Sequence, residues 1–298
     1  MSVTVVGSIA LDTVETPWGR NEEGVGGAAT YFSLAASNYT GVHLVGVVGE
    51  DFPTQYVELL KSKNIDLEGL EIVAGRTFRW SGRYHQDINQ RDTLDTQLNV
   101  FEQFHPKLPR NARQAKYLFL GNIHPSLQLE VLEQASPEFV ALDTMNLWIH
   151  TTLDALKTVM RRVDAILIND SEVRDLTGAT NLVKGAQAIH KLGPGIVIIK
   201  KGEHGCLMFD RAQVFAAPAL PLERVMDPTG AGDSFAGGFM GYLASKETWD
   251  TTTLRQAVVH GSVVASFTCE AFGPKRLAEI GPKEIADRYQ QFRQLVAF

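Results

Sequence analysis

The chain contains little cysteine: Cys206 and Cys269 are the only two among 298 residues, and no CxxC pair occurs. Neither a disulfide framework nor a cysteine zinc cluster is therefore suggested, and a reducing compartment is the default. Residues 1–7 carry no basic stretch before their apolar run, so we expect no export signal and a cytoplasmic protein.

Long hydrophobic runs and an excess of positive charge are also missing. Residues 24–49 contain no Asp, Glu, Lys or Arg, but polar residues and glycines interrupt them, so we expect no membrane partner. The 28 basic and 34 acidic residues give a formal net charge of −6, which argues against a nucleic-acid partner. The apolar fraction of 44% is typical of a globular chain with a large buried core.

Two common nucleotide-binding motifs are absent or mismatched. No Gly-x-x-x-x-Gly-Lys-Ser/Thr occurs, which excludes a P-loop kinase in its usual form. Residues 24–29 resemble a dinucleotide fingerprint, but no strand ends directly before them and residues 43–49 lack the acidic group that would bind a ribose. A Rossmann dehydrogenase is therefore disfavoured.

The close pair of His85 and Asp87 lacks further metal ligands and is interpreted as strand surface.

Short β-branched runs alternate with helix-length stretches over the first two thirds of the chain. The runs predict buried strands at 3–6, 42–48, 117–120, 139–142, 165–168 and 196–199. This alternation indicates βαβ crossovers and a mostly parallel sheet. Longer helical patterns follow at 234–245, 252–270 and 282–298. Because no repeat or linker divides the chain, we expect one α/β domain over residues 1–298.

Two stretches, at about 12–25 and 73–100, break the alternation. The first carries Pro17 and mixed charges where a crossover helix would be expected. In the second, Phe78, Trp80 and Tyr84 share one parity, which predicts antiparallel strands. Together the two stretches predict a small accessory sheet. Both a lid over a binding site and a hairpin that covers a sheet edge fit this pattern.

The second stretch also leaves the role of its side chains open. Arg79, Arg83 and Arg91 fit either a solvated polar face or a contact with a phosphate. Its aromatic residues fit packing better than stacking on a base.

The strongest chemical signal is the segment DPTGAGD at 227–233, which runs into a helical pattern. Gly230, Ala231 and Gly232 allow a tight turn that exposes backbone N–H groups at a helix start, where the helix dipole favours an anion. Asp233 stands at the same point, and the dipole would keep its carboxylate ionised and able to accept a proton from a hydroxyl. An anion hole and a base are thus adjacent in sequence.

A turn and a helix cap would by themselves explain a lone Gly-x-Gly-Asp. The helical pattern that follows also holds Gly237, Gly238 and Gly241. Each interior helix glycine costs roughly 1 kcal/mol relative to alanine, so three of them indicate close approach of a backbone or a ligand.

The segment from 227 to 239 resembles the C-terminal signature of the ribokinase-like (PfkB) family of carbohydrate and nucleoside kinases. The resemblance implies a three-layer α/β/α core with a mostly parallel sheet and a small β-sheet lid. It further implies that Asp233 is the catalytic base and that Gly230, Ala231 and Gly232 surround the charge of the phosphate during its transfer from ATP.

Two other segments resemble the nucleotide-binding motifs of this family. Asn169 and Glu172 match an Asn-x-x-Glu motif that helps to hold Mg²⁺, largely through water, and oxygen ligands suit that cation. Lys200, Gly202 and Gly205 match the nucleotide loop, which implies that they lie near ATP.

The C-terminal part supplies three more implied residues. Phe272 and Gly273 fall where family members line the adenine pocket. The resemblance also suggests a monovalent cation, K⁺, near Asp227.

On the acceptor side, Gly26 and Gly27 match the N-terminal family signature, and Asp12 matches the carboxylate that holds substrate hydroxyls, which implies an acceptor with a diol. Asn146 lies in a segment similar to one that follows a central strand in family sugar kinases. Tyr31 departs from the pattern, because many sugar kinases of the family carry Asn there. This departure argues against an ordinary ribose or fructose contact.

The resemblance thus implies an ATP-dependent kinase that phosphorylates a hydroxyl of a small sugar or sugar derivative. A nucleoside acceptor stays open because its ribose offers the same diol. A non-catalytic nucleotide-binding sensor also stays open, although the retained Asp233 and Glu172 argue against it. Family members dimerise through the lid and the apolar strand at 78–84 suits a homodimer, while a closed monomer fits equally.

Overall fold

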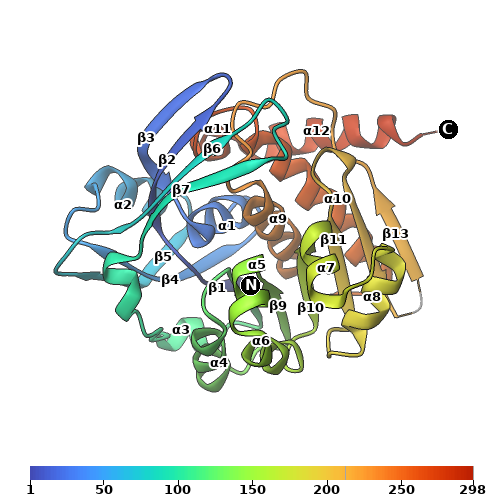
Figure 1. Ribbon diagram of the computed structural model, residues 1–298, viewed down its shortest axis with the longest axis horizontal. Coiled ribbons are helices and arrows are strands. Elements are labelled where there is room, and N and C mark those ends of the chain that lie inside the picture. The colour runs from blue at the N-terminus through green and yellow to red at the C-terminus, as the bar shows by residue number, and fades with distance from the viewer. Residues whose placement is uncertain (212, 298) are drawn as a thin grey trace.

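The computed structural model describes residues 1–211 and 213–297, and its largest element is a nine-stranded sheet (Figure 1). The pairs from β11 through β5 are parallel, whereas β12 and β13 join antiparallel. The order in space is β13 (Gln213–Ala217), β12 (Cys206–Asp210), β11 (Ile196–Lys200), β10 (Ala165–Asn169), β9 (Phe139–Asp143), β8 (Tyr117–Leu120), β1 (Ser2–Val6), β4 (Gly41–Gly49) and β5 (Ile65–Val73). The predicted mostly parallel sheet is confirmed.

Helices cover both faces of this sheet, because successive strand residues such as Val5 and Val6 enter two different apolar cores. The first core includes side chains from α1 (Ala28–Ala36), α2 (Thr54–Lys61), α9 (Ala231–Lys246), α10 (Thr251–Thr268), α11 (Lys275–Glu279) and α12 (Pro282–Leu295). The second includes α3 (Arg110–Arg113), α4 (Pro125–Gln134), α5 (Asn146–Thr151), α6 (Leu153–Met160), α7 (Asp170–Thr177) and α8 (Leu182–His190). The three-layer α/β/α core is confirmed. Within the described residues, no helix combines the length and apolarity needed to cross a membrane.

Strands β5, β12 and β13 were not expected from the sequence. β5 and β13 are the edge strands of the main sheet, and β12 lies between β11 and β13. Polar residues interrupt the apolar pattern of β5, which an edge strand beside water tolerates. β12 and β13 carry short apolar runs, at 206–209 and 214–217, that we did not assign to strands.

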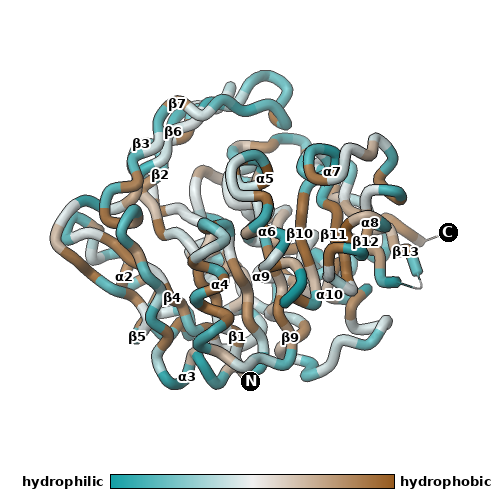
Figure 2. Tube along the Cα trace, turned by 60° about the horizontal axis from the view of Figure 1, so that its bottom comes forward, coloured by the Kyte–Doolittle hydropathy of each residue, from teal (hydrophilic) through white to brown (hydrophobic). Residues whose placement is uncertain are grey.

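A second, four-stranded sheet stands apart from the main one, above the ends of its strands (Figure 2). We call it the lid sheet, and its order is β3 (Gly19–Gly26), β2 (Ala10–Thr16), β6 (Phe78–Tyr84) and β7 (Arg91–Gln97). The predicted segments at 12–25 and 73–100 supply these strands. β2 and β6 pair in parallel, whereas each forms an antiparallel hairpin with its neighbour in sequence. A 3-10 turn, η1 (Asn99–Gln103), follows the sheet.

Helix α9 lies between α1 and α10, and its glycines face the backbones of both. A Cβ at Gly237 would overlap the Phe32 carbonyl of α1, and a Cβ at Gly241 would lie 2.9 Å from Ala36 Cα. On the other side, a Cβ at Gly238 would lie 3.0 Å from the carbonyl oxygen of His260 in α10. The expected close approach is therefore to helix backbones. It positions the N-terminus of α9 at the ends of the parallel strands.

Replacing Gly237 with alanine should destabilise the fold by about 1–3 kcal/mol, the usual cost of overpacking a core. The added methyl group would force α9 away from α1. Gly195→Ala is the matched control, because its Cβ would make only an ordinary contact, 3.7 Å from the Asp164 carbonyl oxygen. Chemical denaturation of the two variants measures the difference, and equal stability would contradict this packing.

Candidate active site

The start of α9 forms a turn that only glycine fits. Gly230 has a φ of 76°, in the left-handed region, and a Cβ there would enter the ring of Tyr31. The Ala231 N–H donates to the Pro228 carbonyl at 3.1 Å, which removes it from the proposed anion hole. The Gly232 N–H has no backbone acceptor among the described residues. It is therefore free to donate to an anion.

Asp233 stands in the first turn of this helix without acting as its cap, because Gly230 occupies the cap position and no side chain there makes a capping bond. Burial, reinforced by the charge of Asp143, raises the pKa of Asp233 to about 7, against the lowering effect of Lys200. We expected the helix dipole to keep this carboxylate ionised. Desolvation outweighs the dipole, and the resulting pKa suits a general base near neutrality.

Lys200, at the end of β11, is the cation nearest to this helix start. Its Nζ forms an ion pair with Asp143 Oδ2 at 3.0 Å, and a Cβ on Gly232 would lie 3.1 Å from the same Nζ. Burial alone would lower the pKa of Lys200, but Asp143, Glu172 and Asp233 raise it above its ordinary value. The lysine therefore carries its positive charge beside the free N–H of Gly232.

Asn169 and Glu172 form a capping box at the start of α7. The Glu172 N–H donates to Asn169 Oδ1 at 2.8 Å, and the Asn169 N–H donates to Glu172 Oε2 at 2.9 Å. Glu172 Oε1 accepts no hydrogen bond from the described residues. Burial and the charge of Asp143 raise the pKa of Glu172 to about 7. The capping box thus gives both residues a structural role and still leaves one accessible carboxylate oxygen of Glu172 without a hydrogen bond from the described residues.

The free oxygen of Glu172 fits a magnesium ion held mainly by water and phosphate. Among the described residues no group of three or more His, Cys, Asp or Glu side chains forms a ready metal cage. Mg²⁺ characteristically takes one or two carboxylates and completes its shell with water and substrate phosphates, so the donor set present here is compatible with it.

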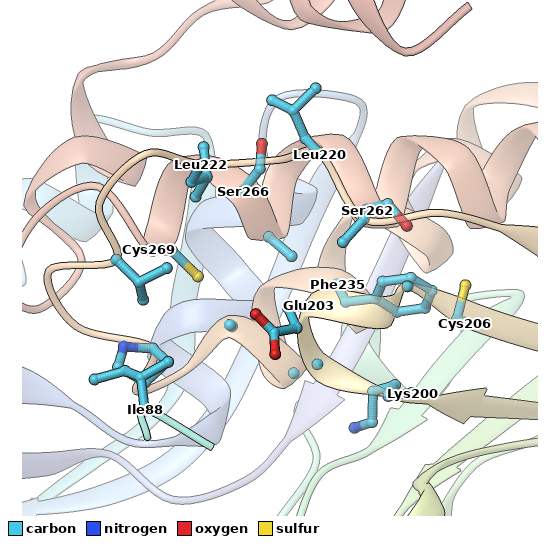
Figure 3. A pocket seen from close by; sticks show the side chains of 18 of the residues that line it. Ile88, Lys200, Glu203, Cys206, Leu220, Leu222, Phe235, Ser262, Ser266 and Cys269 are labelled. Atoms are coloured by element: carbon cyan, nitrogen blue, oxygen red, sulfur yellow. The ribbon is translucent and has the colours of Figure 1, made fainter. Parts of the chain in front are cut away.

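A cavity of about 410 Å³ opens beside the start of α9 (Figure 3). One end is polar and is lined by Lys200, Gly202 and Gly232, and Gly205 also lines the cavity. The other end is apolar and is formed by α10 and by the loop between β13 and α9. Its lining includes Leu220, Leu222, Val225, Ala265 and Cys269. A polar end beside an anion site and an apolar end of this kind suit the phosphates and the base of a nucleotide.

Phe272 and Gly273, expected at the adenine end, do not line this cavity. The Phe272 ring lies against Gly19 of the lid sheet, where a Cβ would be 3.5 Å from Phe272 Cε2. Gly273 has a φ of 59° and donates its N–H to Asp227 Oδ2 at 3.1 Å. The chain turns toward Asp227 after α10, and Cys269, one turn earlier, takes the expected place.

Asp227 is buried and joins two loops. Its Oδ1 accepts the Thr229 N–H at 2.9 Å and its Oδ2 accepts the Gly273 N–H, while burial raises its pKa. These bonds account for the residue as a loop anchor, and within the described residues it belongs to no group of three or more His, Cys, Asp or Glu side chains. K⁺ at Asp227 stays a prediction of the family resemblance, and we derive no step through it.

Asp12 lies near the start of β2, beside Gly26 at the end of β3. Asp12 is 7% exposed, and the Gly27 N–H acts to lower the pKa of its carboxylate. Burial, with the charges of Asp227 and Asp233, raises the pKa of Asp12 to about 7. Gly26 is required beside it, because a Cβ there would overlap the Asp12 carboxylate. The predicted substrate carboxylate thus lies within the electrostatic reach of the predicted base.

Tyr31 and Asn146 differ from what we expected of substrate contacts. Tyr31 is 2% exposed, and its ring packs under Gly230 instead of lying open to a substrate. Asn146 is exposed, and its Oδ1 accepts the Leu147 N–H at 3.0 Å. Asp143, three residues earlier in the chain, lies in the site instead, where it forms the ion pair with Lys200. The position of Asp143 at the carboxyl end of a buried parallel strand is a signal that could have identified it.

The lid sheet presents Trp80 next to Asp12. The two residues are register partners across β2 and β6, so their side chains lie on the same face of the lid sheet. The indole lies over Gly82, where a Cβ would overlap the ring, and Trp80 is only half-buried. Trp80 therefore brings an aromatic ring beside the predicted diol-binding carboxylate, with the Arg91 Cζ 5.1 Å from the ring centroid.

The chain is similar to nucleoside and sugar kinases throughout its length. A family model described as pfkB family carbohydrate kinase matches residues 2–280. The cytidine kinase of Thermococcus kodakarensis is 31% identical over 80% of this chain and 87% of its own length, and the nucleoside kinase of Methanothermobacter thermautotrophicus is 27% identical over 83% and 79%.

Solved structures share the fold at lower identity. The Burkholderia thailandensis nucleoside kinase in complex with inosine aligns with a TM-score of 0.79 at 20% identity, covering 97% of both chains. Ribokinase from Cryptococcus neoformans in complex with ADP aligns with a TM-score of 0.80 at 20% identity, covering 97% of this chain and 99% of its own. With the family match over nearly its whole length, the chain belongs to the pfkB family of carbohydrate kinases.

Proposed function

We propose that the protein is an ATP-dependent nucleoside kinase. The observation that carries this proposal is the pairing of Trp80 with Asp12 on one face of the lid sheet. Asp12 can accept hydrogen bonds from both hydroxyls of a ribose, and Trp80 beside it can stack on a base. The names of two relatives, a cytidine kinase and a nucleoside kinase, support the same acceptor class. A free sugar has no base that could contact the indole.

The reaction follows from the arrangement of the side chains. With the two secondary ribose hydroxyls on Asp12, the primary 5′ hydroxyl is left free to approach Asp233. Asp233 accepts the proton as the hydroxyl oxygen forms a bond to the γ-phosphorus, and the bond to the β,γ-bridging oxygen breaks to release ADP. The Gly232 N–H and Lys200 stabilise the charge on the transferred group. The products are a nucleoside monophosphate and ADP.

Glu172 would hold Mg²⁺ largely through water, and the ion when bound would neutralise charge on the phosphate oxygens. The remaining catalysis is positioning by the protein. Closure of the lid sheet over the acceptor would exclude water, which otherwise competes as acceptor. We also propose that residues 1–298 act as one kinase domain.

Asp233→Asn removes the base while keeping the size of the side chain, so it should lower kcat by about 10²- to 10⁴-fold. Nucleotide affinity should change little. The matched control is Asp154→Asn, which also changes an aspartate in the first turn of a helix, α6, outside the described site. Coupled ADP release with ATP, Mg²⁺ and cytidine measures both variants.

Two results of this assay would contradict the proposal. Full activity in Asp233→Asn would remove Asp233 from the role of base. ATP binding without acceptor-dependent ADP release in the wild-type protein, for any nucleoside or sugar in a panel, would favour the non-catalytic sensor instead.

The rate should rise with pH and level off above about 7, because Asp233 must be ionised to accept a proton and its pKa is raised to about 7. Asp12 and Glu172, with pKa values raised to about the same level by burial, must also ionise. As the pH is lowered, kcat/KM should therefore fall more steeply than it would if only one group had to be ionised. A profile that stays flat between about pH 5 and pH 8 would contradict these assignments.

Trp80→Leu should raise the KM for nucleosides by about 10-fold, since stacking of a base on an aromatic ring contributes about 1–3 kcal/mol. The KM for free ribose, which has no base, should change little. Trp18→Leu is the matched control, because Trp18 is the other tryptophan of the lid hairpins and lies half-exposed against Arg224.

A panel of cytidine, uridine, adenosine, inosine, ribose and fructose measures the difference. Equal losses in the two tryptophan variants would contradict a role for Trp80 in base recognition. Turnover confined to ribose or fructose would instead favour the sugar acceptor.

A further inference from the structure

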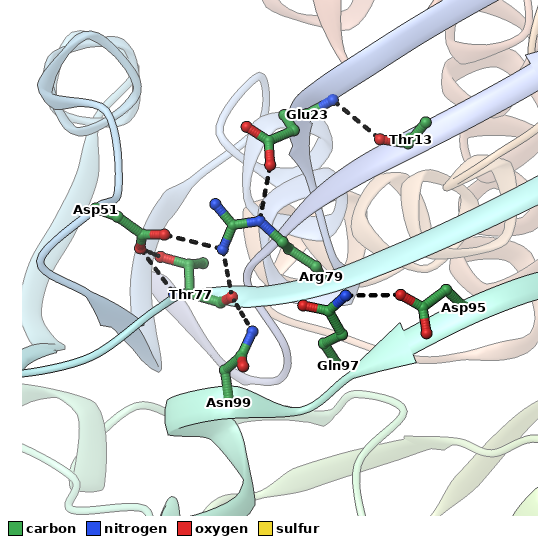
Figure 4. Close-up of polar contacts among 8 residues, drawn as sticks. All are labelled: Thr13, Glu23, Asp51, Thr77, Arg79, Asp95, Gln97 and Asn99. Atoms are coloured by element: carbon green, nitrogen blue, oxygen red, sulfur yellow. Dashed lines mark hydrogen bonds and ion pairs between the residues drawn. The ribbon is translucent and has the colours of Figure 1, made fainter.

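Three arginines of the lid sheet differ in how their charges are paired. Arg79 forms ion pairs with Glu23 at 2.8 Å and Asp51 at 2.9 Å (Figure 4). Arg83 forms an ion pair with Glu15 at 3.1 Å. Arg91 forms no ion pair within residues 1–211 and 213–297. Its positive charge is therefore not neutralised by a neighbouring carboxylate.

The backbone register directs Arg91 toward the active site. It is the first residue of β7 and pairs with Tyr84 at the end of β6. The positive charge of Arg91 acts to lower the pKa of its register partner Tyr84, whose hydroxyl accepts a hydrogen bond from the Thr229 hydroxyl at 3.2 Å. Thr229 immediately precedes Gly230, so this chain of contacts connects Arg91 to the loop at the start of α9.

On its other side, the guanidinium group lies over Trp80, with Arg91 Cζ 5.1 Å from the ring centroid. Trp80 is the register partner of Asp12, which holds the acceptor in the proposed function. Arg91 therefore borders the acceptor space on one side and the loop of Thr229 on the other.

The turn of the same hairpin reaches the nucleotide cavity. Ile88, just before Arg91, lines the cavity (Figure 3). Asn89 and Gly202 are also among its lining residues. Asn89 Nδ2 donates to Glu203 Oε1 at 3.4 Å, across from the lid to the loop after β11. The hairpin thus spans the distance from the acceptor carboxylate to the nucleotide cavity, and Arg91 lies between these two points.

The charges around Arg91 fit this position. Its positive charge acts to lower the pKa of Asp12, Glu172 and Asp233. In the proposed function these carboxylates bind the acceptor, hold Mg²⁺ and accept the proton, respectively. Arg91 pairs directly with none of them. A guanidinium presents several N–H donors in a planar fork that matches the oxygens of a phosphate.

We propose that Arg91 is a catalytic residue carried by the lid, which donates hydrogen bonds to the phosphoryl group during its transfer. In this role it would act together with Gly232 and Lys200 on the charge of the transferred group. The inference rests on the proposed kinase function and adds to it the residue that completes the charge stabilisation when the lid is closed. Arg91 exchanges no proton, and the bonds made and broken are those of the phosphoryl transfer already described.

Arg91→Met should lower kcat by about 10²- to 10³-fold, as does loss of one donor to a transition-state oxyanion. Arg91→Lys should recover part of this loss, because the cation remains while the forked geometry is lost. Arg83→Met is the matched control: it lies in the same hairpin and loses an ion pair on the exposed surface of the lid sheet. Equal kcat values in Arg91→Met and Arg83→Met would overturn the proposal.

A binding measurement separates this inference from the proposed function. With cytidine and Mg²⁺ present, calorimetry compares ADP with the β,γ-imido analogue of ATP. Wild-type protein and Arg83→Met should bind the triphosphate analogue more tightly than ADP, and Arg91→Met should lose this preference while its ADP affinity stays within about twofold. A preference retained in Arg91→Met would overturn the role of Arg91. If the wild-type protein turned over no acceptor, the kinase proposal would fail, and this comparison alone would still decide whether Arg91 contacts the terminal phosphate.

Discussion

The ion pair between Lys200 and Asp143 is the interaction on which the rest of the site depends. Asp143, Glu172 and Asp233 bring three carboxylates into one buried region, and Lys200 is the cation that opposes their mutual repulsion. Removing one member of a buried charge pair leaves the other uncompensated, which is strongly destabilising. The site can hold this many acidic groups only because a lysine and a helix N-terminus lie among them.

The parallel sheet is what assembles these charges. β9, β10 and β11 end at the same edge, and their last residues are Asp143, Asn169 and Lys200. Parallel strands bring residues that are distant in sequence to one line of side chains, where open α/β sheets commonly bind ligands. Helix α9 adds its N-terminus to this line because its glycines let it lie close to α1 and α10.

Much of this arrangement could be predicted from the sequence, because the strand runs are apolar and the key polar residues follow them directly. The turn at 230–232, Asp12 and the capping box at Asn169 fall into this class. The apolar end of the nucleotide cavity could not be predicted, since Leu220, Leu222 and Val225 lie in a loop with no periodic pattern. The raised pKa of Asp233 could not be predicted either, because it results mainly from burial by segments that are distant in the sequence. An argument from the helix dipole considers only the local sequence. Phe272 lies outside the lining of the nucleotide cavity, because the turn after α10 is fixed by a hydrogen bond to Asp227, far away in the chain.

The parallel pairing of β2 with β6 also bears on how the protein folds. The two lid hairpins come from separate parts of the chain, with α1, β4, α2 and β5 between them. Neither hairpin alone is a stable unit, because an isolated two-stranded ribbon is marginal in water. The lid sheet can therefore assemble only after the intervening strands have joined the main sheet, since contacts between distant segments carry the loop-closure entropy of everything between them. The sheet that carries Asp12 and Trp80 is then expected to be among the last parts of the molecule to become ordered.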